Sequence, residues 1–146
     1  FGYDSKEDGT RVITNGLKMT MFDISDLNNP QELFKVTIVD SKYTYSELLY
    51  DHKALLFSKE KNIIAFPLYS SSGRKTNSRA AIYNIDLEKG FSLKGEIANI
   101  TDKYEENVKR IVFVNDTYYT LSDSLVKVAN MDTLEVVKEF TIGDTY

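Results

Sequence analysis

The feature that most constrains the fold of this 146-residue chain is an internal repeat. Three short segments each end an apolar run with Asp or Asn and then one more apolar residue; they are MFDI at 21–24, IYNI at 82–85 and VANM at 128–131. Each continues into a polar turn and a second strand-like run, at 32–38, 92–97 and 136–142. A second pair, KALLF at 53–57 and KRIVF at 109–113, precedes the later two copies. Fixed-period similarity of this kind indicates one structural unit used in tandem.

A four-stranded unit that recurs every ~40–50 residues is typical of a β-propeller blade. Two insertions, at 40–52 and 70–78, explain the longer first interval. We therefore predict an all-β chain of tandem four-stranded antiparallel blades, a partial β-propeller of about two and a half blades. The half blade is placed at 11–39 and the full blades at 54–99 and 109–143. The alternative is a plain meander or sandwich whose copies are similar by coincidence.

Local signals complete this prediction. Residues 17–24 alternate apolar and polar, which places Leu17, Met19 and Met21 on one strand face. The dipeptide at 15–16, Asn-Gly, predicts a two-residue hairpin turn. Pro67 cannot donate a ladder hydrogen bond, so we expect it at an edge or a bulge. Only single helical turns are expected, after Thr44 and after Asp102, because neither stretch is long enough for an amphipathic helix.

Composition excludes several classes of function. The 18 Lys and Arg residues against 22 Asp and Glu give a net charge of −4, which argues against a nucleic-acid binder. No apolar run approaches the ~20 residues of a membrane-spanning helix. The absence of Cys excludes disulfides and Cys nucleophiles, and one His leaves little for a His-rich metal site. The chain starts at Phe1 without a leader pattern, so we expect a processed product or an excised piece of a longer protein.

Two longer motifs resemble a known family. GLKMTMFDISDLNNP at 16–30 resembles a G-L-K-x-x-x-F-D-[VI]-S-D-x-x-N-P segment of secreted bacterial and archaeal proteins that carry a C-terminal β-propeller. YSELLYDHKALLF at 45–57 resembles the Y-S-E-A-L-Y-D-H-K-A-F-L-F stretch of that family, with Leu48 in place of Ala. The resemblance covers nearly the whole chain. It implies the C-terminal portion of an extracytoplasmic, secreted or cell-surface protein, and it brings no catalytic residue.

The candidate binding residues are Tyr45, Glu47, Asp51 and His52. They precede the first strand of a predicted blade, and propellers bind ligands mainly through loops at the channel mouth. For His52 the simpler interpretation is a structural histidine that bonds backbone; the catalytic one needs Ser46 as nucleophile and Asp40 or Asp51 as orienting acid. A hydrolase or lyase acting on cell-surface polysaccharide would use paired carboxylates such as Glu47 and Asp51.

Two further features have alternative interpretations. The turn at 23–29 is rich in oxygen ligands, so Asp23 and Asp26 are candidates for Ca²⁺, although side chains of this kind also cap turns by bonding nearby N–H groups. The polar segment 70–78 is predicted to be a mobile loop. Its Arg74 and Lys75, with Arg79, could hold an anionic polymer or simply be solvated.

Tyrosines are abundant, with ten in the chain. Five of them fall in or beside predicted connections: Tyr43, Tyr45, Tyr50, Tyr69 and Tyr104. Such rings pack between blades or stack on sugars and protein partners. The function we expect is a non-catalytic scaffold for interaction or for binding a protein or carbohydrate ligand, with no cofactor. A cation-stabilised structural module is an alternative. The expected partners are the remaining blades of a longer chain, or a second copy bound through exposed sheets.

Overall fold

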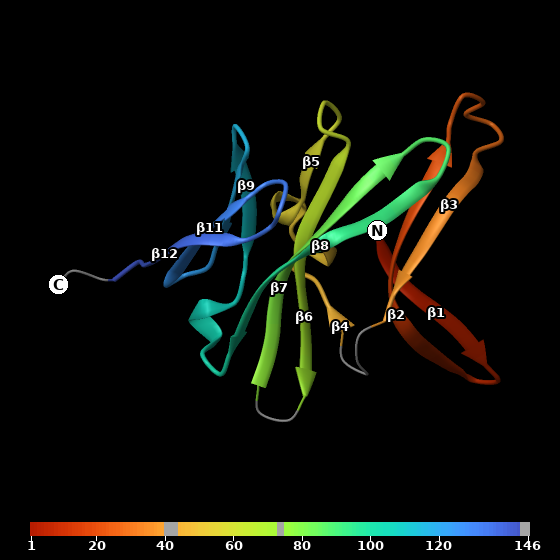
Figure 1. Ribbon diagram of the computed structural model, residues 1–146. Coiled ribbons are helices and arrows are strands. Elements are labelled where there is room, and N and C mark those ends of the chain that lie inside the picture. Colours follow the sequence, from red (N-terminus) through yellow and green to blue (C-terminus); the bar gives the residue numbers. More distant parts are fainter. Residues whose placement is uncertain (40–43, 73–74, 144–146) are drawn as a thin grey trace.

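A computed structural model describes residues 1–39, 44–72 and 75–143 as three antiparallel β-sheets that lie side by side (Figure 1). The described residues also form three short 3-10 helices and no α-helix: η1 (Glu47–Leu49), η2 (His52–Ala54) and η3 (Tyr104–Glu106). None of these described helices has the length and apolar character needed to cross a membrane. The prediction of an all-β chain of tandem antiparallel sheets, a partial propeller, is confirmed.

The strands follow one another as simple meanders. The first sheet has the order β1 (Gly2–Asp8), β2 (Arg11–Asp23), β3 (Gln31–Ile38). In the second sheet β4 (Thr44–Tyr45) and β5 (Leu56–Ser58) both pair with β6 (Ile63–Ser72), which is followed by β7 (Lys75–Asp86) and β8 (Gly90–Thr101). The third sheet has β9 (Arg110–Val114), β10 (Thr117–Leu121), β11 (Leu125–Asn130) and β12 (Val136–Thr141). The first sheet therefore has one strand position fewer than the other two.

The same irregularity recurs in all three sheets. The pairing of the last two strands shifts register at Met21/Phe22, Ile82/Tyr83 and Val128/Ala129. Each shift lies just before the Asp or Asn of the repeated motif. A bulge at an equivalent place in every sheet indicates that the three sheets are versions of one unit. The blade boundaries at 11–39, 54–99 and 109–143 remain a prediction, and β1 lies outside the first of them.

The second sheet is buried on both faces because it lies between the other two (Figure 1). Along β6, Ile63 and Ala65 face the third sheet, whereas Phe66 and Leu68 face the first sheet, where they meet Leu17. Successive side chains of a strand point to opposite faces, so a two-sided core needs a continuous apolar run. The run at 63–68 supplies it, and burial of such side chains is the main stabilising contribution.

The predicted hairpin at Asn15-Gly16 is wrong. Strand β2 runs straight through these residues, and the β1–β2 turn lies at Gly9-Thr10. Asn15 has no partner in the register, since Asp4 pairs with Gly16 and Ser5 with Thr14. A Cβ on Gly16 would lie 2.4 Å from the carbonyl oxygen of Ile38. Glycine at position 16 therefore permits a β-bulge and the close approach of the Ile38 backbone, and it does not form a turn.

The predicted loop at 70–78 is also wrong in the part that the structure describes. Strands β6 and β7 continue through Ser72 and from Lys75, and residues 73 and 74, including Arg74, lie outside the described residues. Arg79 is buried at 3% exposure, and its Nε donates to Glu96 Oε1 over 2.8 Å. Arg79 is therefore not available to hold an anionic polymer.

Pro67 lies in the interior strand β6, neither at an edge strand nor at a bulge. It faces the gap between β4, which pairs at Tyr69 and Ser70, and β5, which pairs at residues 63–65. In this gap the Ser46 hydroxyl donates to the Pro67 carbonyl over 2.5 Å. The missing N–H costs nothing here because no strand pairs with β6 at this point on the side of β4 and β5, whereas β7 pairs with it on the other side.

Candidate functional site

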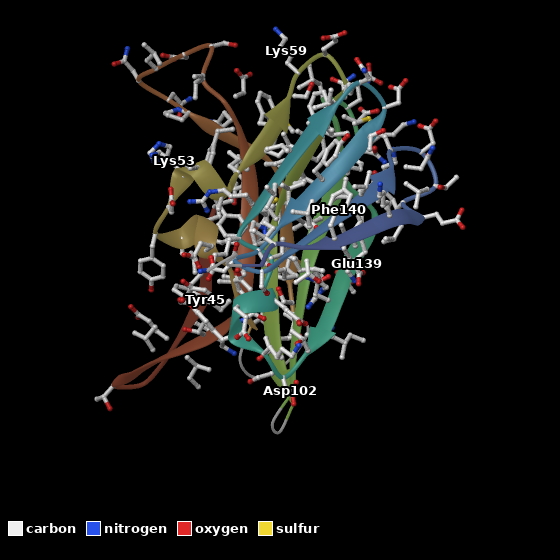
Figure 2. The ribbon with its side chains drawn as sticks, turned by 90° about the vertical axis from the view of Figure 1, so that its left-hand side faces the viewer. Tyr45, Lys53, Lys59, Asp102, Glu139 and Phe140 are labelled. Atoms are coloured by element: carbon white, nitrogen blue, oxygen red, sulfur yellow. The ribbon has the colours of Figure 1, made fainter. Side chains whose placement is uncertain are left out.

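A pocket of about 420 Å³ is lined by side chains from strands β4, β6 and β7, from η1, and from the segment that leads through η3 to β9. We call it the tyrosine pocket; its lining residues are Tyr45, Glu47, Tyr69, Thr76, Tyr104, Asn107 and Lys109. Figure 2 shows Tyr45 beside the teal turn of η3. Strand β4 supplies Tyr45, η1 supplies Glu47, and η3 with the residues after it supplies the last three. No single sequence segment builds this site.

Stacked tyrosine rings form one wall. The Tyr45 ring stacks on Tyr69 with centroids 5.6 Å apart and on Tyr50 at 5.9 Å. The Tyr69 hydroxyl donates to the carbonyl oxygen of Val108, which ties β6 to the chain segment before β9. Burial, and then the Glu47 carboxylate, raise the pKa of both Tyr45 and Tyr69 above the usual value. Both phenols are therefore neutral at physiological pH.

Asn107 is the unexplained polar group of the pocket. It is only 6% exposed, and its Oδ1 has no hydrogen-bond partner in the described part of the chain. The neighbouring Asn99 also has an unpartnered Oδ1, although its Nδ2 donates to the Glu106 carbonyl over 2.8 Å. The Val108 N–H donates to Ser78 Oγ over 2.8 Å. A buried carbonyl without a donor costs about 1–3 kcal/mol. Such a group requires a reason for its retention.

The charged side chains of the pocket have opposite signs. The Tyr45 hydroxyl lies 3.5 Å from Glu47 Oε2. Lys109 Nζ lies 2.5 Å from Asp123 Oδ2 and 5.4 Å from the centroid of the Tyr104 ring. Its hydrogen bond to Asp123 raises the pKa of Lys109, so this ammonium group is charged and already paired. Because Asp123 already pairs with Lys109, the Glu47 carboxylate is left with only the long contact from the Tyr45 hydroxyl.

Local capping positions Tyr45 and Glu47. Ser46 is the N-cap of η1, and its Oγ accepts from the Leu48 N–H while it donates to Pro67. The single turn predicted after Thr44 is therefore present, with Ser46 in place of Thr44 as its cap. Because Ser46 is fully buried, this bond fixes the start of η1 against β6.

The structure brings together only two of the four predicted binding residues. Tyr45 and Glu47 line the tyrosine pocket, whereas Asp51 and His52 do not. Asp51 caps η2 by accepting from the Lys53 N–H over 2.9 Å, and its Oδ2 lies 2.5 Å from Arg110 Nη2. The Lys53 bond and the Arg110 charge lower the pKa of Asp51. His52 is exposed, and its backbone carbonyl accepts from the Leu55 N–H.

Sequence reasoning missed most of the other lining residues. Tyr69 and Tyr104 were recognisable only as tyrosines beside connections. Thr76, Asn107 and Lys109 carry no motif, and only the fold shows that they share one pocket.

At the turn after β2, both candidate calcium ligands are engaged in turn hydrogen bonds. Asp23 Oδ1 accepts from the N–H and the hydroxyl of Ser25, over 2.8 and 2.6 Å, and Asp26 Oδ1 accepts from the Asn28 N–H over 3.0 Å. The Ser25 bonds lower the pKa of Asp23. Within residues 1–39, 44–72 and 75–143, no three His, Cys, Asp or Glu side chains are grouped to hold a metal ion. These contacts are those of Asx turns.

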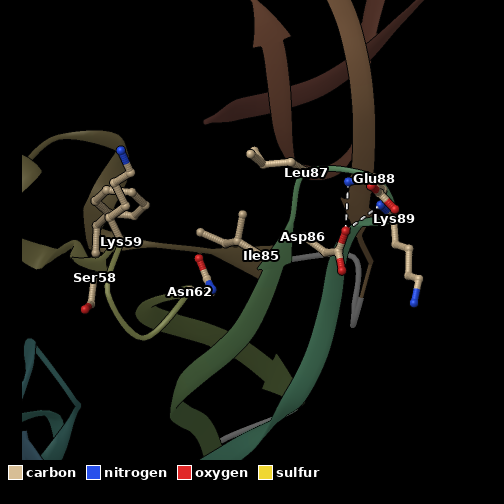
Figure 3. A pocket seen from close by; sticks show the side chains of 9 residues that line it. Ser58, Lys59, Asn62, Ile85, Asp86, Leu87, Glu88 and Lys89 are labelled. Carbon is tan, nitrogen blue, oxygen red and sulfur yellow. Dashed lines mark hydrogen bonds between the residues drawn. The ribbon is translucent and has the colours of Figure 1, made fainter.

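A second pocket of about 550 Å³ lies between the β5–β6 and β7–β8 turns (Figure 3). Figure 3 shows Lys59 and Leu87 on separate turns around it, and the Asp86 carboxylate bonded to its own turn. Asp86 Oδ1 accepts from the Glu88 and Lys89 N–H groups, over 2.7 and 3.0 Å. Leu87 is 79% exposed. This pocket is a gap between exposed turns, and its Asp86 and Ser58 side chains accept hydrogen bonds within those turns.

Comparison with known proteins agrees with the architecture. The model of the β-propeller domain family matches residues 1–134. The uncharacterized protein MJ1554 of Methanocaldococcus jannaschii is 28% identical over 123 residues, which are 84% of this chain and 17% of that protein. The chain thus corresponds to a small part of its relative. No solved structure matches it significantly. With a family match over nearly its whole length and three tandem antiparallel sheets, the chain belongs to the β-propeller domain family.

Proposed function

We propose that this chain is part of a non-catalytic, extracytoplasmic β-propeller module that serves as a binding scaffold, with the tyrosine pocket as its ligand site. The observation that carries the proposal is the convergence of Tyr45, Glu47, Tyr69 and Asn107 from separate elements around one pocket. Rigid sheets that hold polar and aromatic connection residues around one hollow are a common arrangement for ligand recognition. The extracytoplasmic location rests on the family resemblance of the motifs at 16–30 and 45–57.

The carboxylates support binding rather than hydrolysis. A glycosidase needs two carboxyl groups on either side of the scissile bond, one of them with a raised pKa. Glu47 lines the pocket, but Asp51 is turned to η2 and Arg110, and its pKa is lowered. Asp51 is therefore suited to a structural ion pair and not to proton donation.

The two outer sheets differ in the faces that they leave uncovered. On the third sheet, the face away from the second sheet is largely apolar in its middle and carries a charged residue in each of two rows. Val112, Tyr119 and Val128 form one cross-strand row that ends at Lys138. The next row runs from Arg110 through Leu121 and Val126 to Phe140. Val112 is 44% and Phe140 40% exposed. On the first sheet, the corresponding face carries Lys18 opposite Thr37 and Thr20 opposite Lys35.

We propose that further blades of a longer chain cover the apolar face of the third sheet. Propellers close with four to eight blades, and a blade buries both faces only between two neighbours. The relative has most of its length outside the matched region, which leaves ample chain for such blades. The first sheet also lacks a fourth strand position, so the free edge of β1 is a place where a strand from elsewhere can pair.

Chemical-shift mapping tests the proposed binding site. Amide spectra of the isotope-labelled chain are recorded with mixtures of saccharides, amino acids and short peptides. We expect perturbed amides at residues 45–47, 69 and 104–109. A matched control is Glu88→Gln in the second pocket, which leaves the perturbations unchanged. Perturbations confined to residues 57–62 and 85–89, or chemical conversion of an added compound, would contradict the proposal.

A further inference from the structure

We infer that the ligand of the tyrosine pocket carries a protonated primary amine. This inference rests on the proposed function, since it names the chemical class that the site takes. Two properties of the pocket carry it: a carboxylate that lacks a cation, and the tyrosine rings that lie close to this carboxylate.

The carboxylate of Glu47 has no cationic partner among the residues that the structure describes. Its one hydrogen bond there is the 3.5 Å contact from the Tyr45 hydroxyl. The Glu47 side chain is half-buried at the edge of the pocket. A carboxylate in such a place attracts a cation more strongly than one in bulk water, because the effective dielectric constant near protein is lower. A ligand with a positive charge would therefore gain from this contact.

The ammonium group of Lys109 is engaged elsewhere. Its Nζ lies 2.5 Å from Asp123 Oδ2. The hydrogen bond to Asp123 is the main cause of the raised pKa of Lys109, and the charge of Glu47 is the smallest of the causes. Lys109 and Asp123 neutralise each other as a pair. Among the lining residues, all of which the structure describes, the charge that remains is the negative charge of Glu47.

Tyrosine rings lie close to this carboxylate. After burial, the charge of Glu47 is the largest cause of the raised pKa of both Tyr45 and Tyr69. An ammonium group bound to Glu47 would therefore lie beside these rings, and tyrosine rings attract cations to their faces. The pocket already contains one such contact, since Lys109 Nζ lies 5.4 Å from the centroid of the Tyr104 ring. Aromatic and carboxylate groups together favour a cation and disfavour an anion.

A primary amine fits the hydrogen-bonding groups and the size of the pocket. Its protonated form has three N–H donors and no acceptor. The Glu47 carboxylate and the Thr76 hydroxyl both line the pocket and can accept such bonds. The volume of about 420 Å³ lies in the usual range for small-ligand sites. For a simple alkylamine we expect a Kd on the order of 1 mM, because ion pairs and cation–π contacts near the surface are each weak.

Chemical-shift titration of the isotope-labelled chain tests the inference at neutral pH, where alkylamines are protonated. One arm uses the free amines butylamine and putrescine, and the other uses N-acetyl-lysine amide, which presents the same group as a lysine side chain. We expect saturable shifts at residues 45–47 and 104–109 with at least one of these amines. The neutral analogue N-butylacetamide should give none. Raising NaCl from ~0.02 to ~0.5 M should weaken amine binding, since salt screens the attraction between charges.

A charge variant and a matched control identify the carboxylate responsible. Glu47→Gln keeps the size of the side chain and should weaken amine binding about fivefold, while amide spectra show that the variant is folded. Glu88→Gln changes the net charge by the same amount in the second pocket and should bind like the unchanged protein. Equal amine binding by Glu47→Gln and the unchanged protein would overturn the inference, as would equal binding of N-butylacetamide.

Two other outcomes separate this inference from the proposed function. Binding of saccharides or neutral peptides at residues 45–47 and 104–109, with no amine bound, would overturn the amine inference and leave the proposed binding site standing. Absence of shifts with every compound would overturn both.

Discussion

Leu134, in the turn between β11 and β12, occupies the space that a side chain on Gly95 of β8 would need. Its Cδ1 lies 2.5 Å from the position of a Cβ on that glycine. At the start of the same strand, the Phe34 ring of the first sheet lies 2.7 Å from the corresponding position on Gly90. Strand β8 therefore has a glycine at each of two contacts, Gly90 against the first sheet and Gly95 against the third sheet. These two contacts help to set the spacing of the three sheets.

Substitution of Gly95 by Ala should destabilise the chain by about 1–3 kcal/mol. Gly95 has φ +156°, which side chains rarely adopt, and the new Cβ would displace Leu134, itself at φ +60°. The free energy of unfolding from urea titration measures the effect. Gly2→Ala is the control, because a Cβ there meets nothing within 4 Å. Equal stability of the two variants would show that the contact is unimportant.

Tyr69 should make the folded state sensitive to alkaline pH. Burial raises the pKa of this phenol in the folded chain above the unfolded value near 10. Its contribution to stability is therefore complete below about pH 10 and is lost as pH rises toward the folded pKa. The expected slope is a fraction of ~1.4 kcal/mol per pH unit, because solvent screens a partly exposed group.

Tyr69→Phe tests this dependence. Urea unfolding between about pH 9 and 11 should show a shallower loss of stability for the variant than for the unchanged protein. Near neutral pH the variant should lose about 1 kcal/mol, because the Val108 carbonyl loses its donor. Identical slopes for the two proteins would mean that Tyr69 does not contribute to the alkaline transition.

The apolar face of the third sheet should drive self-association of the isolated chain. With no further blade present, Val112 and Phe140 are exposed, and apolar surface of this kind promotes pairing between copies. Sedimentation equilibrium should show associated species that dissociate in the double variant Val112→Lys, Phe140→Lys. Thr37→Lys on the polar face of the first sheet is the control. A folded chain that is strictly monomeric would contradict the proposal that further blades cover this face.

The turn after β11 should depend on the side-chain oxygen of Asn130. Its Oδ1 accepts from the N–H groups of Asp132 and Thr133, over 2.9 and 3.1 Å. Asn130→Ala removes both bonds and should cost about 1 kcal/mol in urea unfolding, whereas Asn130→Asp keeps the acceptor and should cost less. Equal losses in the two variants would show that the oxygen is not what stabilises this turn.

Much of the fold could be predicted because its signals are local. Alternation placed Leu17 and Met19 in a core, and the repeated Asp or Asn marked the same turn in each sheet. Local signals failed where two meanings share one pattern. Asn15-Gly16 fits a hairpin and a bulge equally well, and the small polar residues at 70–78 fit a loop and a hydrogen-bonded strand end. The close approach of the Ile38 carbonyl to Gly16 identifies the bulge. The hydrogen bond from the Val108 N–H to Ser78 Oγ holds the strand at the second position.

The candidate site was predicted only in part for the same reason. Tyr45 and Glu47 could be chosen because they precede the first strand of a blade. Asp51 also precedes that strand, but it forms an ion pair with Arg110, which is distant in sequence, and it does not line the pocket. Asn107 could not be predicted. What distinguishes it is a buried Oδ1 without a hydrogen-bond partner in the described residues, and only the packing of the chain decides whether a buried atom finds a partner.

The amino-acid sequence by itself determined that this chain is all-β and built from repeated units, because the two-residue period of a strand and the recurring Asp or Asn are local patterns in the order of residues. Only the tertiary structure decided which connections meet. The tyrosine pocket, the buried Arg79 and the uncovered face of the third sheet depend on register and on the packing of one sheet on the next. Register and sheet packing bring together residues that are far apart in the chain, and no local sequence pattern specifies such contacts.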